Sequence, residues 1–167
     1  TKAKVLNGGW HRWLSEGRPV TFHATKRPAA AFKAQPNASL YATVEYLKEN
    51  HEDPACQVMD TRTDEEWAGT NSRGNKRVGR VPNARHLEWL NFVAKDDARK
   101  FLPAAELQRL VDEAGFVREK PVITYCQGGI RAAHAAFVLA LLGYDDVRVY
   151  DGSMREWANR QDTPLEV

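Results

Sequence analysis

The most constraining feature of this sequence is a short apolar strand that leads directly into a cysteine, a pair of glycines and a helix. Residues 121–125 have the character of a buried strand, and residues 131–142 form an apolar helix pattern that ends at Gly143. Between them lies the cysteine loop, which consists of Cys126, Gln127, Gly128, Gly129, Ile130 and Arg131. A strand joined to a helix by so short a loop is typical of a parallel sheet covered by helices.

The same alternation of strands and helices continues on both sides of the cysteine loop. Further strands are predicted at residues 56–60, 84–87 and 147–150, and further helices at residues 64–68, 103–114 and 153–159. Ser39 is expected to cap another helix, in which Leu40, Val44 and Leu47 keep helical spacing. These patterns predict an α/β fold with a central parallel sheet flanked by helices on both faces.

The beginning of the chain resembles a stretch near its end. Residues 5–13 and residues 149–157 share Val, Gly and Trp at the same spacing, and both indicate a short strand, a polar turn and a helix. We therefore expect residues 1–20 to be the tail of a preceding, mostly absent domain of the same kind. Residues 21–38 are expected to be a linker and residues 39–167 the main domain. Trp10 and Trp13 are expected to pack against the absent polypeptide.

Charge and composition exclude several classes of protein. The 24 Lys and Arg residues nearly balance the 22 Asp and Glu residues, so a dedicated nucleic-acid binder is not expected. The longest apolar run, residues 135–142, is too short to span a bilayer, so no membrane partner is expected either. The chain does not open with a signal-peptide pattern, which favours a cytoplasmic location, or a periplasmic one if an upstream signal was removed. Two cysteines are too few for a disulfide scaffold and leave room for a reactive thiol.

Cys126 is the candidate nucleophile. A free thiol is mostly protonated at neutral pH, but the amides and the dipole of a following helix stabilise its thiolate. Gly128 and Gly129 allow the backbone to curl into a nest of N–H donors, and Arg131 adds a positive charge. We therefore expect a solvent-accessible anion cup around Cys126. Cys56 begins an apolar strand without such neighbours and is expected to be structural.

Three stretches together resemble the rhodanese family of sulfurtransferases. The first, residues 125–157, combines the cysteine loop, the alanine-rich helix and a Val-Tyr-Asp-Gly-Ser segment followed by Trp157. The second, residues 59–69, is similar to the family's Asp-x-Arg and Glu-aromatic-x-Gly segment. The third, residues 79–89, is similar to its Gly-His-Ile-Pro-Gly-Ala segment. The resemblance covers about residues 39–162, and the order of the three motifs makes it specific.

The resemblance implies a rhodanese-like α/β domain that works by double displacement. The Cys126 thiolate would take the outer sulfur of a small anionic donor, with thiosulfate preferred, and hold it as a persulfide until a thiol or cyanide accepts it. Donor and persulfide would be bound by Gln127, Gly128, Gly129, Ile130 and Arg131. No metal and no organic cofactor is implied. Because many members are tandem, the implied partner is the missing N-terminal rhodanese-like domain, possibly present as a separate chain.

Other residues are expected to support the loop. Asp60 and Arg62 are expected to form an ion pair beneath it, because partly buried charges need partners. His86 and Trp89 are candidates for the pocket rim, although an aromatic residue there more often packs. Four basic residues of the polar loop at residues 69–81 are expected to be solvated rather than to attract the donor, namely Arg73, Lys76, Arg77 and Arg80.

The sequence departs from thiosulfate-specific members at two positions and leaves alternatives open. Gly128 stands where they commonly have a basic residue, and Glu66 stands where they often have arginine, so Arg131 is expected to replace the missing charge. The alternatives are a 3-mercaptopyruvate sulfurtransferase, a persulfide carrier for a protein partner and, more distantly, a cysteine-phosphatase-like enzyme. The phosphatase loop has five residues between cysteine and arginine, whereas this loop has four.

Overall fold

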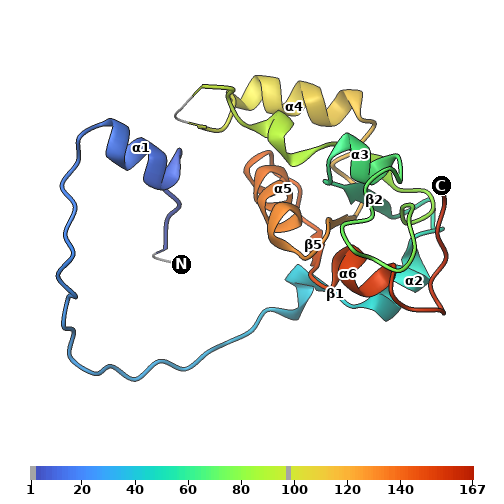
Figure 1. Cartoon of the computed structure of the whole chain (residues 1–167), viewed down its shortest axis with the longest axis horizontal. Helices are drawn as coiled ribbons and strands as arrows, with labels where there is room; N and C mark the ends of the chain where they lie inside the picture. Colours follow the sequence, from blue (N-terminus) through green and yellow to red (C-terminus); the bar gives the residue numbers. More distant parts are fainter. Residues whose placement is uncertain (1–2, 97–98) are drawn as a thin grey trace.

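The computed structural model describes residues 3–96 and 99–167, and it is built around a parallel sheet (Figure 1). Within these residues five strands lie in the order β1-β5-β4-β2-β3, and every neighbouring pair is parallel. The strands are β1 (Tyr41–Ala42), β2 (Gln57–Asp60), β3 (Arg85–His86), β4 (Val122–Tyr125) and β5 (Val147–Tyr150). Every residue of β2 and β4 is buried, as expected for central strands covered on both faces. The predicted α/β fold with a central parallel sheet is confirmed.

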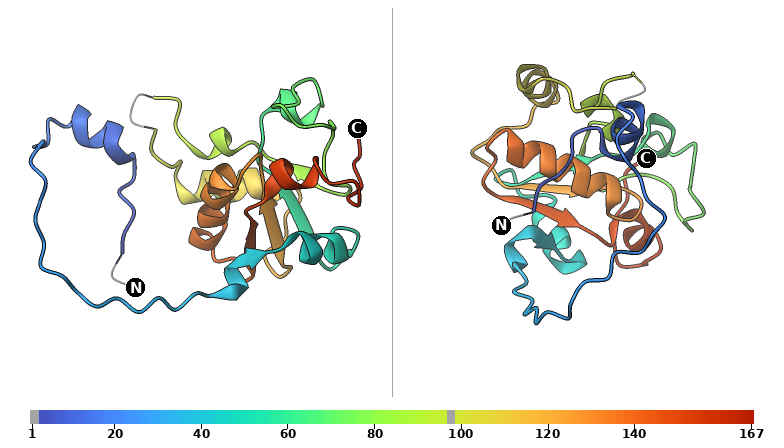
Figure 2. Two further views of the ribbon diagram at one scale, coloured as in Figure 1. Left: turned by 60° about the horizontal axis from the view of Figure 1, so that its bottom comes forward. Right: turned by 90° about the vertical axis from the view of Figure 1, so that its left-hand side faces the viewer.

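Alternating strand side chains build two hydrophobic cores, one on each face of the sheet. Met59, Val122 and Val147 belong to one core, together with side chains of α4 (Ala104–Glu113) and α5 (Ile130–Leu141). Val58 and Ile123 belong to the other, together with side chains of α2 (Val44–Asn50) and α6 (Ser153–Trp157). Figure 2 shows the helices on the two sides of the sheet. Because both faces are filled, a site for chemistry is left at the ends of the strands.

The first strand and the helix after it differ from the expectation for Ser39. Residues 38–40 form a short 3₁₀ helix, and Tyr41–Ala42 pairs with Val149 and Tyr150 at the edge of the sheet. The helix begins at Val44 instead, where Thr43 Oγ1 accepts a hydrogen bond from Tyr46 N at 3.1 Å. The helical spacing of the apolar residues concealed β1, because two residues are too few to show a strand period.

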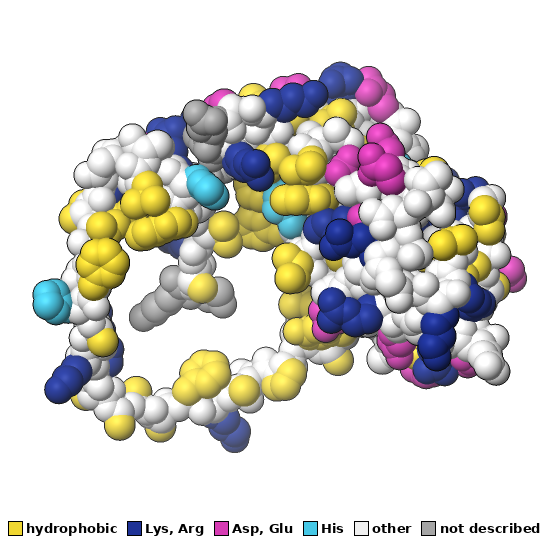
Figure 3. All heavy atoms as spheres, viewed as in Figure 1, with side chains coloured by type: hydrophobic (Ala, Val, Ile, Leu, Met, Phe, Trp, Pro, Cys, Tyr) yellow, Lys and Arg dark blue, Asp and Glu magenta, His cyan; other side chains and the backbone are white. Residues whose placement is uncertain are grey.

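The N-terminal segment lies apart from the sheet. The helix α1 (Gly9–Ser15) contains no buried residue, and residues 18–37 contain no helix or strand. Figure 1 shows residues 18–37 as an extended connection, and Figure 3 shows hydrophobic side chains exposed along this segment. Trp10 is 61% exposed, whereas Trp13 Nε1 donates to Pro19 O at 2.9 Å. The division into tail, linker and main domain stays a prediction, and residues 1–2 of the expected tail lie outside the described residues.

The polar loop at residues 69–81 is held against the C-terminal residues. The Arg77 guanidinium is partly buried and donates to the carbonyl oxygens of Trp157, Ala158, Arg160 and Thr163. Arg80 pairs with Glu166, both through the backbone and through an ion pair at 2.7 Å. The expectation that Arg77 is a solvated loop residue is therefore wrong, because its guanidinium binds four backbone carbonyl groups near the C-terminus, two of which also accept from the Thr163 hydroxyl.

Among the described residues, no helix has the length and apolar character needed to cross a bilayer. The expected cytoplasmic location stays a prediction.

Candidate active site

Cys126 directly follows the central strand β4, and α5 begins at Ile130 a few residues later. The loop between them is bonded to the start of α6. Met154 N donates to Cys126 O at 3.0 Å, and Arg155 N donates to Gln127 O at 2.9 Å. Cys126 is 1% exposed, so the expected solvent-accessible thiol is not present in this structure. The sequence suggested an open loop because it did not show that α6 packs onto the loop backbone.

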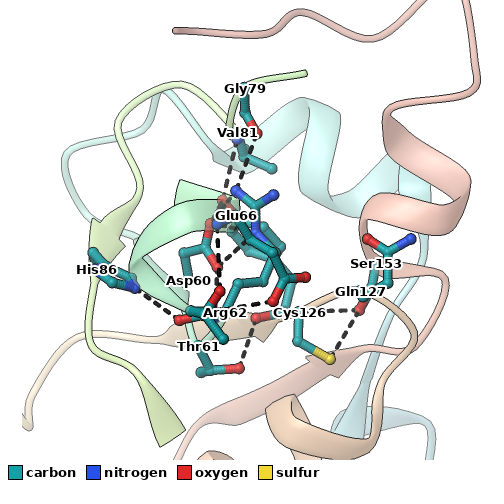
Figure 4. Close-up of polar contacts among 12 residues, drawn as sticks. Asp60, Thr61, Arg62, Glu66, Gly79, Val81, His86, Cys126, Gln127 and Ser153 are labelled. Atoms are coloured by element: carbon teal, nitrogen blue, oxygen red, sulfur yellow. Dashed lines mark hydrogen bonds and ion pairs between the residues drawn. The ribbon is translucent and has the colours of Figure 1, made fainter. Parts of the chain in front are cut away.

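Ser153, at the start of α6, lies beside Cys126 and binds the backbone of the loop (Figure 4). Its Oγ accepts hydrogen bonds from the amides of Cys126 at 3.1 Å and Gly129 at 3.2 Å, and it donates to Tyr150 O at 2.8 Å. It also lies 4.0 Å from Cys126 Sγ. The Gly129 amide, which was expected to bind the donor and persulfide, is therefore bonded to a hydroxyl instead, as is the amide of Cys126 itself. Sequence reasoning missed Ser153, although it lies in the segment that resembles the end of a rhodanese domain.

The remaining loop amides are free to bind an anion. Within the described residues, no hydrogen-bond acceptor pairs with the amides of Gln127, Gly128, Ile130 or Arg131. Unpaired N–H groups at the beginning of a helix carry partial positive charge, so they stabilise an anion held at the mouth of α5. This arrangement keeps the physical basis of the predicted anion cup, with four donors rather than the whole loop.

The second loop glycine is required by the backbone geometry. Gly129 has a φ of +84°, a region that side chains other than glycine rarely adopt. A Cβ atom at this position would also overlap the carboxylate oxygen Oδ1 of Asp151. The loop can therefore approach the turn before α6 only because residue 129 has no side chain.

Arg131 forms a partly buried pair with Glu66, which lies in α3 (Asp64–Trp67). Its guanidinium donates to both carboxylate oxygens, at 2.6 and 2.9 Å, and the Glu66 side chain is 2% exposed. Burial acts to raise the pKa of Glu66, but the hydrogen bonds and charge of Arg131 lower it below its ordinary value, so Glu66 is ionised at neutral pH. Thr63 and Glu66 also form a capping box that fixes the carboxylate. Arg131 is therefore half of a balanced pair and not the uncompensated charge that the sequence suggested.

Asp60 and Arg62 form the expected ion pair at the end of β2, where Arg62 Nη2 lies 2.6 Å from Asp60 Oδ2. Both side chains are buried, and Arg62 also donates to Gly79 O at 3.0 Å. Tyr125, the residue before the cysteine, donates its hydroxyl to Asp60 Oδ2 at 2.6 Å. Burial and then the charge of Asp60 raise the pKa of Tyr125 well above its ordinary value, so it remains a donor. This network joins β2, β4 and the polar loop and touches no loop amide.

His86 and Trp89, the candidates for the pocket rim, are both in packing contacts. His86 Nε2 lies 2.8 Å from Arg62 O, and its ring stacks on Trp67 with centroids 5.0 Å apart. Trp89 packs edge-on against His134, with centroids 5.3 Å apart. Their role at a rim stays a prediction.

The second cysteine lies far along the sheet from the loop. Cys56 precedes β2, whereas Cys126 follows β4. Because these neighbouring strands are parallel, the two thiols lie at opposite ends of the strands. Burial raises the pKa of the Cys56 thiol, which makes it a poor nucleophile. Among the described residues, no group of three or more histidine, cysteine or acidic side chains is placed to hold a metal ion.

Comparisons with known proteins agree on one family. A family model described as the rhodanese-like domain matches residues 43–160. The chain is 35% identical over 159 residues to the thiosulfate sulfurtransferase of Bos taurus, which covers 93% of this chain and 53% of the relative. It is 31% identical over 175 residues to the sulfur carrier protein TtuD of Thermus thermophilus, covering 97% of this chain and 60% of the relative.

A solved structure agrees with the sequence relatives. A variant of EanB, described as a complex with ergothioneine covalently linked with a persulfide cysteine, superposes with a TM-score of 0.87 at 25% identity. The match covers 98% of this chain and 41% of EanB. The chain thus spans about half the length of the curated relatives it matches.

Proposed function

Because this chain belongs to the rhodanese-like family, we propose that it is a sulfurtransferase that carries sulfane sulfur as a persulfide on Cys126. The observation that carries the proposal is the place of Cys126, at the end of the central strand and before four unpaired amides at the start of α5. The names of the relatives support it, since one is a thiosulfate sulfurtransferase and another is a sulfur carrier. EanB, in the structure described above, holds a cysteine persulfide.

The proposed reaction with thiosulfate has two balanced steps. In the first, the Cys126 thiolate attacks the outer sulfur of the donor, a new S–S bond forms, and the old S–S bond breaks. The electron pair of the broken bond leaves with sulfite, and the negative charge of the thiolate passes to the outer persulfide sulfur. In the second step, cyanide or a thiolate attacks that outer sulfur and returns the electron pair to Cys126. The free loop amides stabilise both anions without any change of protonation.

The buried position of Cys126 adds one requirement to this mechanism. A thiol that is 1% exposed cannot meet a donor unless the loop rearranges locally. The side chains of Gln127 and Asn75, which bond each other through both amide groups at 3.0 Å, are only partly buried. We propose that this amide pair separates when the donor enters.

We propose an N-terminal rhodanese-like domain as the protein partner. The matched relatives are about twice the length of this chain, and α1 leaves apolar side chains such as Trp10 and Leu14 exposed. A second domain that packs on α1 would bury them.

Intact-mass spectrometry after incubation with thiosulfate or 3-mercaptopyruvate tests the proposal. We expect one added sulfur in the wild-type chain and in Cys56→Ser, and none in Cys126→Ser. The donor that loads Cys126 decides between the thiosulfate and mercaptopyruvate alternatives. Loading without turnover to cyanide, but with transfer to a protein thiol, would identify a carrier. Absence of added sulfur with either donor, together with phosphatase activity, would refute the proposal in favour of the phosphatase-like alternative.

A further inference from the structure

A polar hollow of about 460 Å³ lies beside the cysteine loop. One wall comes from the polar loop at residues 69–81. The other comes from Arg155 of α6 and from Asn159, two residues after the end of α6, and the cysteine loop contributes Gln127. Its lining residues are Asn71, Arg73, Gly74, Asn75, Gln127, Arg155 and Asn159. No acidic side chain lines the hollow, and its size is in the range of small-molecule sites.

The two arginines of the hollow carry positive charge that no carboxylate balances fully. Within the described residues, the Arg155 side chain forms no ion pair. The Arg73 side chain is 56% exposed, and its only such contact is with Glu66 at 3.9 Å. Glu66 is already bonded through both oxygens to Arg131. The hollow is therefore positive, whereas the Arg131–Glu66 pair beside the cysteine is balanced.

The side-chain amides of the hollow are ordered by each other and retain donors. Asn75 and Gln127 exchange hydrogen bonds at 3.0 Å, and Asn159 Nδ2 donates to Asn75 Oδ1 at 3.1 Å. Each amide nitrogen of Asn75 and Gln127 has two hydrogens and uses one of them in this pair. The second hydrogen of each is available for an oxyanion, and the first also becomes available once the entering donor separates the pair.

Gly128 brings Arg155 against the cysteine loop. A Cβ atom at residue 128 would lie 3.1 Å from Arg155 Nη2 and 3.2 Å from its Cζ, closer than ordinary contacts. The absence of a side chain at residue 128 therefore lets the guanidinium lie against the loop backbone, at a position two residues after Cys126 in the sequence. A guanidinium presents a planar fork of donors that suits an oxyanion.

We infer that this hollow is the anion subsite of the sulfur donor, in which Arg155 and Arg73 bind the oxyanion group while the outer sulfur reaches Cys126. The inference rests on the proposed sulfur-transfer function and adds the residues that select the donor. It predicts that the sulfur donor bears an oxyanion group, as thiosulfate does. The sulfite group would leave from the hollow when the S–S bond breaks.

The test compares Arg155→Gln, Arg73→Gln and the double variant with Arg109→Gln, which removes an exposed arginine on α4. Steady-state kinetics with thiosulfate and cyanide should show KM raised about ten-fold by each single variant, with kcat changed far less. Arg155→Lys should recover part of the loss, and Arg109→Gln should match the wild-type chain. Far-UV circular dichroism and thermal melting identify any variant that fails to fold, in which case Arg155→Lys and Arg73→Gln carry the comparison.

A second measurement separates failure of the subsite from failure of the proposed function. Calorimetric titration of thiosulfate into the Cys126→Ala chain measures donor binding without transfer. Weaker binding in the double variant supports the subsite even if Cys126 is never loaded. Unchanged KM or unchanged binding in the double variant, or no thiosulfate binding by the Cys126→Ala chain, would overturn the inference.

Discussion

Replacement of Glu66 by glutamine should lower stability while it strengthens the attraction of the site for anions. Glu66 accepts two charge-assisted hydrogen bonds from Arg131, at 2.6 and 2.9 Å, and its side chain is 2% exposed. Removal of one member of a buried pair costs about 3 to 5 kcal/mol, but glutamine keeps one oxygen as an acceptor. With one charged hydrogen bond lost, we expect the free energy of unfolding at pH 7 to fall by about 2 to 3 kcal/mol.

The stability lost in Glu66→Gln should depend on pH and become smaller in acid. Arg131 holds the pKa of Glu66 in the folded chain below the ordinary value of 4.5, against the effect of burial. The stability that this carboxylate contributes is therefore complete above about pH 4.5 and declines as the pH falls through the folded-state pKa. Glutamine does not titrate, so the difference between wild type and Glu66→Gln should shrink in acid.

Urea unfolding followed by circular dichroism at neutral and acidic pH measures this difference, and Glu113→Gln is the matched control. Glu113 pairs with Arg109 on the surface of α4, so its replacement should have no resolvable effect. The variant Glu66→Gln should also show a lower KM for thiosulfate, because Arg131 then acts as an uncompensated charge beside the loop. Equal stability of the variant and the wild type at pH 7, or a difference that does not change with pH, would refute the reasoning.

Three further substitutions test separate contacts. Gly129→Ala should cost about 1 to 3 kcal/mol and reduce persulfide formation, because of the positive φ and the overlap with Asp151; thermal melting and mass spectrometry measure the two effects. Ser153→Ala should cost about 1 to 3 kcal/mol, because it leaves the amides of Cys126 and Gly129 without an acceptor, and urea unfolding would show no change if that bonding were unimportant. Arg77→Met should lower the unfolding free energy by about 2 kcal/mol and make the C-terminal residues more sensitive to proteolysis, since four carbonyl groups lose a hydrogen bond from the guanidinium.

Local patterns predicted those parts of the fold that local physics determines. The buried strand before Cys126 and the helix after it follow from a continuous apolar run, a glycine turn and a terminal glycine. The strand β1 was missed because Tyr41 and Ala42 are extended only through pairing with β5. The prediction for Arg77 was wrong because a charged side chain in a polar loop is expected to face solvent. Its hydrogen-bond acceptors lie some 80 residues later in the chain, where local sequence does not reveal them.

The sequence predicted where the candidate site lies, from its cysteine and its glycines, but it did not predict the electrostatics of the site. The sequence shows that Arg131 stands in the loop, and nothing near it indicates that a buried carboxylate 65 residues earlier balances its charge. The same limit applies to Cys126, since its burial depends on contacts with the start of α6. The roles assigned to the loop residues, and to His86 and Trp89, stay predictions.

The segment at residues 151–155 contacts the cysteine loop at several points, and these contacts bear on the proposed chemistry. Asp151 in the turn before α6, and Ser153 and Arg155 in the first turn of α6, meet Gly129, the amide of Cys126 and Gly128 respectively. The cysteine loop and this segment are therefore joined, and the segment fixes the loop backbone that carries the free amides. A persulfide adds a sulfur atom and moves the negative charge outward from Cys126, which is 1% exposed in this structure. The stability of the persulfide therefore depends on residues 151–155 as well as on the loop that carries it.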